Sequence, residues 1–338
     1  MRPVNDTTPF FALRESQELA SSVSQYAGLS LSALEERHFE GGEFKLRPLQ
    51  SVRDRPTFVF QCLAGTPEAP LSERLLKVLF LLHGLRDAGA TRRTVLLPYM
   101  TFARKDRRTQ VRDPVNTRYV AQLLESAGVD RVITLDVHNP AALDNSFRVP
   151  VDHLSALPMM VNHFVTQLPD TPLTVASPDI GGVKRAQIFR ESLESRLERE
   201  VELAFFEKRR AQGVVSGQAL VGNTKGRTVI IIDDLCATGG TLLRAAEGCM
   251  RAGAAAVYAA VTHAPHTPGL AAVLANKAIA GVVTTDSIGY PLSPLLPEAT
   301  QRLTVLSIAP LFGTALQRIL SGKPLAPLLE RWPVTDAS

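Results

Sequence analysis

Two adjacent carboxylates, Asp233 and Asp234, stand directly after the apolar run Val229 to Ile232. The residues at 237–241 read Ala-Thr-Gly-Gly-Thr and lead into a segment with helical periodicity. Glycines let backbone N–H groups approach an anion closely, and a helix N-terminus adds positive potential. Carboxylates in turn suit sugar hydroxyl groups or a hydrated cation. The stretch therefore predicts a site for a phosphorylated sugar, against the simpler alternative of a tight turn with two solvated acids.

A second charged stretch, PYMTFARKDRR at 98–108, directly follows another apolar run. Its cations surround the single acid Asp106 and are Arg104, Lys105, Arg107 and Arg108. Such a cluster can neutralise a polyphosphate, and arginine suits bidentate phosphate contacts. A solvated loop is the ordinary interpretation of a charge run, but the position after a strand favours a ligand.

Two more strand ends carry groups that could hold a metal. His138 lies just beyond the run 131–136, and Asp179 lies just beyond the run 173–177. A lone histidine is more often a structural hydrogen-bonding residue, because Mg²⁺ prefers oxygen ligands. An aspartate in this position could equally be the N-cap of a helix. The residues alone leave both assignments open.

The segment 208–225 begins Lys-Arg-Arg, contains glycine and lacks periodicity. This composition predicts a mobile loop. With Lys208 and Arg210 at its start, such a loop could act as a lid that brings cations to an active site. A solvated charge triplet is the alternative.

The composition is that of an ordinary globular protein. The chain has 338 residues, 45% of them hydrophobic and 21% charged, with a formal net charge of +4. This charge fits small anionic substrates, and no basic block with interleaved aromatic residues indicates nucleic-acid binding. The three cysteines lack metal-ligand spacing and favour a reducing compartment. No signal peptide or membrane span is evident, so we expect a soluble, cytoplasmic protein.

Apolar runs of strand length alternate with amphipathic segments over almost the whole chain. The expected strands are 57–63, 93–99, 131–136, 173–177, 228–233, 256–263, 281–286 and 303–307. The expected helices are 72–88, one that begins at Asn116 as its N-cap, 184–198, 240–252 and 308–321. Strands that are apolar throughout and alternate with helices predict an α/β fold with mainly parallel sheets flanked by helices.

A change of domain is expected near residues 150–170, where a second series of strands and helices begins. We therefore predict an N-terminal domain at 1–155, a C-terminal domain at 156–325 and a tail at 326–338. Both halves contain a strand that ends in acid, at Asp136 and at Asp233, which is a weak indication of duplication.

In chain order, these stretches resemble the motifs of the phosphoribosyl-diphosphate (PRPP) synthetases, also called ribose-phosphate pyrophosphokinases. FEGGE at 39–43 resembles their adenine-contact element, and 98–108 resembles their P-Y-x-x-Y-A-R-Q-D-R segment. SPDIGGVKRA at 177–186 matches a third family segment closely, and 134–140 resembles a fourth. The likeness runs from about residue 10 to about residue 325. It implies two tandem domains of the type I phosphoribosyltransferase fold.

The resemblance also implies an activity and its residues. Members transfer the β,γ-diphosphoryl group of ATP to the C1 hydroxyl of ribose 5-phosphate, giving AMP and PRPP for nucleotide biosynthesis. ATP would be bound by Phe39, Glu43, Arg104, Lys105, Asp106 and His138. Mg²⁺ would be the cofactor, held by His138 and Asp179. Ribose 5-phosphate would be bound by Asp233, Asp234, Ala237, Thr238, Gly239, Gly240 and Thr241. Lys208 and Arg210 would be catalytic residues of the flexible loop.

In the family the adenine-contact element reaches a neighbouring subunit, so the resemblance implies a homo-oligomer, a dimer or an assembly of dimers. The chain departs from the family pattern at Gly41, Phe102, Lys105 and Ala237. The change at Ala237 removes a carboxylate beside the phosphate loop, and those at Gly41 and Lys105 bear on the choice of nucleotide. Two alternatives remain: a phosphoribosyltransferase that consumes PRPP, and a catalytically silent regulatory homologue. Neither nucleic acid nor a membrane is an expected partner.

Overall fold

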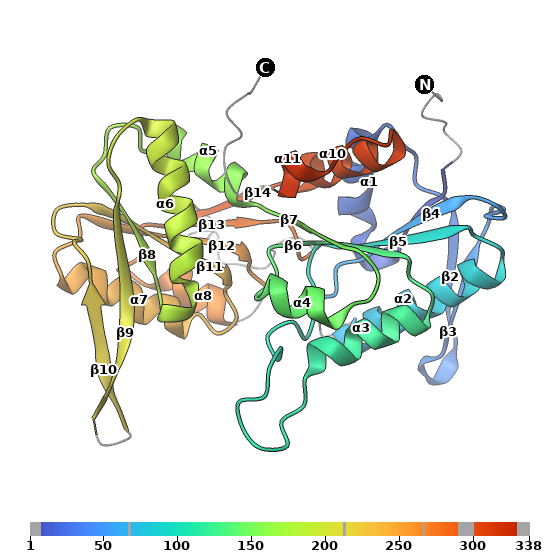
Figure 1. Cartoon of the computed structure of the whole chain (residues 1–338), viewed down its shortest axis with the longest axis horizontal. Helices are drawn as coiled ribbons and strands as arrows, with labels where there is room; N and C mark the ends of the chain where they lie inside the picture. Colours follow the sequence, from blue (N-terminus) through green and yellow to red (C-terminus); the bar gives the residue numbers. More distant parts are fainter. Residues whose placement is uncertain (1–7, 67–68, 212–213, 266–267, 290–300, 330–338) are drawn as a thin grey trace. The chain divides into compact units, whose positions relative to one another are not determined.

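The computed structural model of the chain describes residues 8–66, 69–211, 214–265, 268–289 and 301–329. The chain forms two compact units (Figure 1). Unit 1 contains the described residues up to Ser155 together with 286–289 and 307–329. Unit 2 contains the described residues from Ala156 to Thr285 together with 301–306. Both units combine a mainly parallel sheet with helices, so the predicted α/β class is confirmed.

Unit 1 is built on a five-stranded sheet in which all neighbouring strands are parallel. In spatial order the strands are β1 (Phe10–Ala12), β4 (Pro56–Phe60), β5 (Arg92–Leu97), β6 (Arg131–Leu135) and β7 (Val151–Leu154). Each strand lies beside the strand of this sheet that precedes it in the chain. The sheet therefore grows in one direction only.

Helices cover both faces of this sheet (Figure 1). One face carries α2 (Leu71–Asp87) and α3 (Asn116–Ser126), and the other carries α1 (Gln17–Ala27) and α10 (Ala309–Leu320). Adjacent residues of β4 show the alternation: Val59 joins the core under α2, whereas the Phe60 ring lies 6.0 Å from the Phe312 ring of α10. Unit 1 also contains α4 (Pro140–Ser146), α11 (Ala326–Leu329) and the 3₁₀ turn η1 (Arg14–Ser16).

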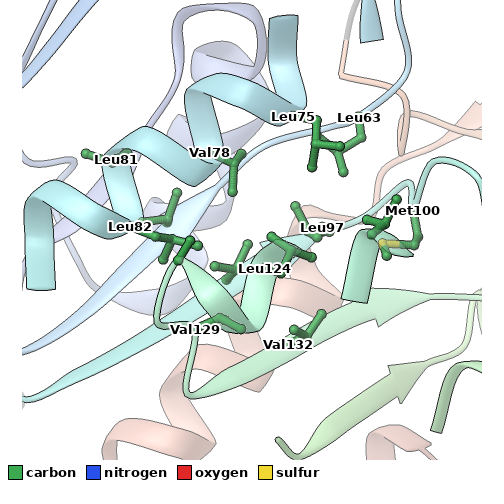
Figure 2. Close-up of a cluster of buried hydrophobic side chains, with 14 of the residues drawn as sticks. Leu63, Leu75, Val78, Leu81, Leu82, Leu97, Met100, Leu124, Val129 and Val132 are labelled. Atoms are coloured by element: carbon green, nitrogen blue, oxygen red, sulfur yellow. The ribbon is translucent and has the colours of Figure 1, made fainter. Parts of the chain in front are cut away.

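Figure 2 shows the core between this sheet and α2. Leu75, Val78, Leu81 and Leu82 recur along α2 at intervals of three or four residues, so they project from one face of the helix. Leu97, Val132 and Leu124 meet them from two strands and from α3. All of these side chains are buried, which fixes the strand ends that carry the functional loops.

An antiparallel hairpin, β2 (Leu34–His38) and β3 (Phe44–Pro48), lies beside α2. It is fastened by Lys77 of α2, whose side chain is only 1% exposed. The Lys77 Nζ atom lies 2.6 Å from Glu15 Oε1, 2.7 Å from Glu36 Oε1 and 2.9 Å from Glu73 Oε1. These carboxylates come from η1, β2 and α2, so one buried cation joins the hairpin to the rest of the unit.

Unit 2 contains a seven-stranded sheet that is parallel except at one edge. In spatial order its strands are β10 (Val214–Val221), β9 (Glu202–Ala211), β8 (Leu173–Ser177), β11 (Thr228–Leu235), β12 (Ala256–His263), β13 (Gly281–Thr285) and β14 (Leu303–Leu306). From β8 the chain proceeds to β9 on one side and later places β11 on the other. The order of strands thus reverses between β8 and β11, which makes this point a topological switch.

The helices of unit 2 also form two layers (Figure 1). On one face, α7 (Gly240–Arg251) and α8 (Pro268–Ala275) share a buried core with β11, β12 and β13. On the other face lie α5 (Leu157–Gln167) and α6 (Val183–Leu197), where the Phe164 ring lies 6.2 Å from Phe189 and 6.1 Å from Tyr258.

The segment 208–225 differs from its prediction as an aperiodic loop. Most of it belongs to the antiparallel hairpin of β9 and β10, in which Lys208 pairs with Gln218 and Phe205 pairs with Val221. The prediction was wrong because this is an edge hairpin, whose strands are held by the backbone ladder more than by an apolar pattern. Residues 212–213 lie outside the described residues.

Two further observations differ from the sequence analysis. Helix α10, within the range assigned to the second domain, packs against α1 in unit 1, where Gln317 Nε2 donates to the Tyr26 carbonyl oxygen at 2.7 Å. Helix α3 begins at Asn116 itself with Val115 in the cap position, so the predicted N-cap role of Asn116 is wrong. Among the described residues, no helix has both the length and the hydropathy needed to cross a membrane.

Candidate functional site

The turn between β11 and α7 has the geometry of an anion-binding loop. Gly239 adopts a left-handed conformation with φ +74°, and a Cβ there would lie 2.6 Å from the Gly269 carbonyl oxygen. Both conformation and space therefore require glycine at this position. Helix α7 begins at Gly240, and the first N–H groups of a helix have no intrahelical acceptor. Its N-terminus thus offers donors and positive potential at the turn.

The side chains of this turn leave room for a ligand from solvent. Thr238 is exposed, and Ala237, Gly240 and Thr241 are half-buried. The first turn of α7 reads Gly-Thr-Leu-Leu and carries no carboxylate that would repel an anion. All the residues that the sequence predicted for the phosphate are therefore brought together in one turn.

Asp233 and Asp234, at the end of β11, share a cation from α6. The Arg185 Nη1 atom lies 3.2 Å from Asp233 Oδ1 and 2.9 Å from Asp234 Oδ1. The Asp234 backbone N–H also donates to Asp233 Oδ1, at 2.9 Å. The two carboxyl side chains are 22% and 7% exposed. A buried acid pair thus lies directly before the glycine turn.

Burial and the neighbouring carboxylate raise the pKa of Asp233 to about 7, although Arg185 opposes the shift. Two close carboxylates in a poorly solvated position cannot both ionise cheaply, and one arginine only partly compensates them. The ionised form of Asp233 is therefore disfavoured. Such a site gains from any ligand that brings hydroxyl donors or positive charge.

Asp179 lies at the end of β8, beside β11 in the sheet. Its Oδ1 accepts from the Gly182 N–H at 3.2 Å and caps the 3₁₀ turn η3 (Ile180–Gly182) that leads into α6. The Ser177 hydroxyl donates to the Asp179 carbonyl oxygen at 2.6 Å. A Cβ at Gly182 would lie 2.6 Å from Ser177 Oγ, so glycine lets this turn close. In this structure Asp179 has the N-cap role that was the alternative to metal binding.

The loop that follows β5 in unit 1 is organised by Asp113. The Lys105 ammonium group forms an ion pair with the Asp113 carboxylate and donates to Thr109 Oγ1 at 3.2 Å. Arg104, Arg107 and Arg108 are exposed. The predicted cation cluster is therefore present, with Lys105 turned towards its own loop.

The loops that follow β5 and β6 meet through a hydrogen bond between side chains. Asn139 Nδ2 donates to Asp106 Oδ2 at 2.7 Å, and Asn139 Oδ1 accepts from the Ala142 N–H at 3.2 Å as the N-cap of α4. His138 precedes Asn139 and is exposed. The hydrogen bond thus brings the segment around Asp106 to the segment around His138 at one end of the sheet.

The FEGGE element forms the tip of the β2–β3 hairpin. It contains the 3₁₀ turn η2 (Glu40–Gly42), and the Phe39 N–H donates to the Glu43 carbonyl oxygen at 2.8 Å. The Phe39 ring is 43% exposed, with the Arg37 guanidinium carbon 5.1 Å from its centroid. Glu43 is also exposed. An exposed aromatic ring at a hairpin tip is available to stack on a planar ligand.

The side chains of the predicted catalytic residues Lys208 and Arg210 lie outside the described part of the structure. Their backbones belong to β9, where Lys208 pairs with Gln218 and Arg210 pairs with Val215. Within the described residues, no cluster of three or more histidine, cysteine or acidic side chains could hold a metal by itself.

Sequence reasoning missed the groups that act as counter-ions and supports. Arg185 was quoted in the 177–186 motif, but its contact with the acid pair depends on packing between α6 and β11. Asp113 and Asn139 were likewise passed over. The short separation of Lys105 and Asp113 in the sequence, eight residues, was a signal that could have indicated the role of Asp113.

Comparison with known proteins defines the class. Residues 8–128 match the family model of the N-terminal domain of ribose phosphate pyrophosphokinase, and residues 156–272 match that of the phosphoribosyl transferase domain. Together these ranges cover more than half of the chain. The predicted tandem of two phosphoribosyltransferase-type domains is confirmed.

Relatives of nearly equal length extend the match over the chain. Ribose-phosphate pyrophosphokinase 1 of Streptococcus agalactiae is 35% identical over 324 residues, which cover 95% of this chain and 96% of the relative. Ribose-phosphate pyrophosphokinase of Caldanaerobacter subterraneus is 33% identical, covering 97% and 99%. The crystal structure of phosphoribosylpyrophosphate synthetase from Mycobacterium smegmatis matches with a TM-score of 0.83 and 32% identity, covering 93% of this chain and 99% of that one. The chain belongs to the ribose-phosphate pyrophosphokinase family.

Proposed function

We propose that this protein is a ribose-phosphate diphosphokinase. It transfers the β,γ-diphosphoryl group of ATP to the C1 hydroxyl of ribose 5-phosphate and releases AMP and PRPP. The observation that carries this proposal is the acid pair followed by the glycine turn at the switch point of unit 2. In the same chain, residues 8–128 match the N-terminal domain of ribose phosphate pyrophosphokinase.

Unit 2 would bind ribose 5-phosphate. The 5-phosphate would accept hydrogen bonds from N–H groups and hydroxyls of 238–241 at the start of α7, with Ala237 lining the turn. Asp233 and Asp234 would accept hydrogen bonds from ribose hydroxyls, and Arg185 would hold both carboxylates in place. A carboxylate held between a cation and a hydroxyl donor is a strong acceptor.

Unit 1 would bind ATP. Arg104 and Lys105 would contact the triphosphate, and Asp106 and His138 would lie at its edge, where Asn139 joins their loops. Phe39 and Glu43 at the hairpin tip would contact adenine. Because the hairpin tip is exposed, the adenine site of one chain could receive it from a second chain, and a homo-oligomer is part of the proposal.

Mg²⁺ would be the cofactor. Asp179 in unit 2 offers a carboxylate and His138 in unit 1 offers an imidazole, each as a candidate donor within its own unit, and phosphate oxygens of ATP would supply the further ligands that Mg²⁺ requires. When bound, the ion neutralises charge on the transferring phosphates. Lys208 and Arg210 in the β9–β10 hairpin would stabilise the charge that develops in the transition state, which is the main contribution an enzyme can make to phosphoryl transfer.

The two alternatives are less well supported. A phosphoribosyltransferase that consumes PRPP does not account for the match of residues 8–128 to the pyrophosphokinase N-terminal domain. A silent regulatory homologue would account for Ala237 and Gly41, but it has no use for the retained cations. Three buried free thiols, at Cys62, Cys236 and Cys249, support a cytoplasmic location as part of the proposal.

A product assay tests the proposal. The purified chain is incubated with Mg²⁺, ATP and ribose 5-phosphate, and AMP, ADP and PRPP are measured together. We expect AMP and PRPP in equal amounts, largely lost in a Lys208→Ala variant. ADP without PRPP would refute diphosphoryl transfer. Nucleotide binding without any product would favour the silent homologue.

A further inference from the structure

Lys105 is one of the cations proposed to bind the triphosphate, and its ammonium group is already engaged. It pairs with the Asp113 carboxylate of the same loop and donates to Thr109 Oγ1 at 3.2 Å. The Lys105 and Asp113 side chains are 31% and 21% exposed. A cation proposed to bind triphosphate therefore already has a partner in the absence of a ligand.

The Asp113 carboxylate accepts hydrogen bonds from donors other than Lys105. Its Oδ2 accepts from the Thr109 N–H at 2.9 Å, from the Thr109 hydroxyl at 2.7 Å and from the Gln110 N–H at 3.0 Å. The Lys105 ammonium and these donors hold the pKa of Asp113 well below its usual range. The turn 109–113 would keep its hydrogen bonds if Lys105 moved away.

Lys105 is therefore the member of the pair that we expect to move. A lysine side chain has a flexible stem and carries a compact charge that can re-aim, and a partly exposed ion pair costs little to separate. The exposed Arg104, Arg107 and Arg108 on the same loop would attract a polyanion to it. A chain of phosphates offers Lys105 several anionic oxygens. The Asp113 carboxylate offers it one partner, and that carboxylate keeps its other hydrogen-bond donors when Lys105 leaves.

We propose that the Lys105–Asp113 ion pair is a latch, which a nucleoside triphosphate opens by taking Lys105 away from Asp113. Asp113 is thereby a positioning residue that weakens nucleotide binding and sets its affinity. This inference deepens the proposed function and rests on it for the identity of the nucleotide. It requires no contact between Asp113 and the nucleotide.

The latch is tested by the affinity of the full chain for a non-hydrolysable ATP analogue with Mg²⁺, measured by titration calorimetry. In Asp113→Asn, the amide oxygen still accepts from Thr109 and Gln110, but the charge that holds Lys105 is gone. We expect the analogue to bind about threefold more tightly, the size of a partly exposed ion pair. In a Lys105→Gln background, the same change at Asp113 should leave the affinity unaltered.

Two controls separate the latch from general electrostatics. Asp87→Asn removes an equal charge from an exposed position on α2, 3.8 Å from the Arg86 Nε atom, and should leave the affinity unchanged. Ribose 5-phosphate should bind Asp113→Asn as it binds the wild type, which also shows that the variant is folded.

The latch is overturned if Asp113→Asn binds the analogue equally or more weakly, if the gain persists without Lys105, or if the wild type does not bind the analogue. These outcomes are distinct from failure of the proposed activity. The activity would be refuted, and the latch would stand, if the wild type binds the analogue and makes no PRPP while Asp113→Asn raises the affinity only when Lys105 is present.

Discussion

Among the described residues, each unit of the molecule contains a cluster of charges around a poorly exposed cation or acid pair, and these two clusters are opposite in kind. In unit 1, Lys77 lies among Glu15, Glu36 and Glu73 and is almost fully buried. In unit 2, Arg185 lies between Asp233 and Asp234, one of which is 22% exposed. The first cluster joins three elements of the fold, and the second stands at the open end of a strand.

The pKa shifts of the two clusters have opposite directions. In unit 1 burial by itself would raise the pKa of Glu15, but the hydrogen bond from Lys77 and other hydrogen bonds outweigh burial and lower that pKa. The hydrogen bond from Lys77 also lowers the pKa of Glu73. In unit 2 burial and the adjacent carboxylate raise the pKa of Asp233 to about 7. Shifted pKa values of this kind cluster at ligand-binding sites, so the unit 2 pair is the candidate for contact with a ligand.

Replacing Lys77 with methionine should have the largest effect on stability. The change leaves three carboxylates without their common cation in a poorly solvated position, and removing one partner of a buried ion pair costs about 3–5 kcal/mol. Urea denaturation of the full chain measures the free energy of unfolding. The unfolding of the wild type should become easier as the pH falls through the low folded pKa values of Glu15 and Glu73, and this sensitivity should weaken in the variant.

The matched control for Lys77 is Arg47→Met on the hairpin. Arg47 pairs with Glu35 at 2.6 Å but is 60% exposed, so its removal should cost less than about 1 kcal/mol. Equal costs for the two variants would mean that the unit 1 cluster is not a special support of the fold.

Asp234→Asn should have the next largest effect, this time on ligand binding. Hydrogen bonds to a charged acceptor contribute about 1.5–3 kcal/mol, so the affinity for ribose 5-phosphate should fall by about 10- to 100-fold. The affinity for an ATP analogue should change little, because the residues proposed for ATP lie in other segments. Calorimetric titration with each ligand separates the two effects, and a comparable loss for both ligands would break the contrast between the units.

Asp233→Asn should stabilise the free protein relative to the wild type at and above neutral pH. The folded pKa of about 7 exceeds the usual 3.8, so between these values the folded state binds more protons than the unfolded state. The contribution of Asp233 to stability is therefore lost as the pH rises towards 7. Urea denaturation at pH 5 and pH 8 should show a difference between variant and wild type that grows with pH. A difference independent of pH would contradict this assignment.

The smallest effect is expected for Glu73→Gln. Glu73 is 29% exposed and is one of several partners of Lys77, so the glutamine should cost less than about 1 kcal/mol in urea denaturation. A cost as large as that of Lys77→Met would mean that Glu73 alone, and not the cluster, holds the lysine.

The strands and helices that depend on a local residue pattern could be predicted from the sequence. The strand 228–233 was identified from its β-branched residues and the helix 240–252 from its apolar spacing, and these two elements place the acid pair and the glycine turn. The β9–β10 hairpin was missed because the Lys-Arg-Arg triplet and the glycines interrupt its apolar pattern, and because its ladder depends on pairing across the turn. Arg185 and Lys77 were missed as well, since a cation between acids from other elements leaves no periodic signal.

The central claim is that unit 2 receives ribose 5-phosphate and unit 1 receives the nucleotide. Hydrogen–deuterium exchange of the full chain, with each ligand added alone, tests this claim most directly. The account predicts that ribose 5-phosphate slows exchange in 236–244, and that a Mg²⁺-bound ATP analogue slows exchange in 102–113 and 136–143. Protection of the unit 1 loops by ribose 5-phosphate, or of neither region by its proposed ligand, would contradict it.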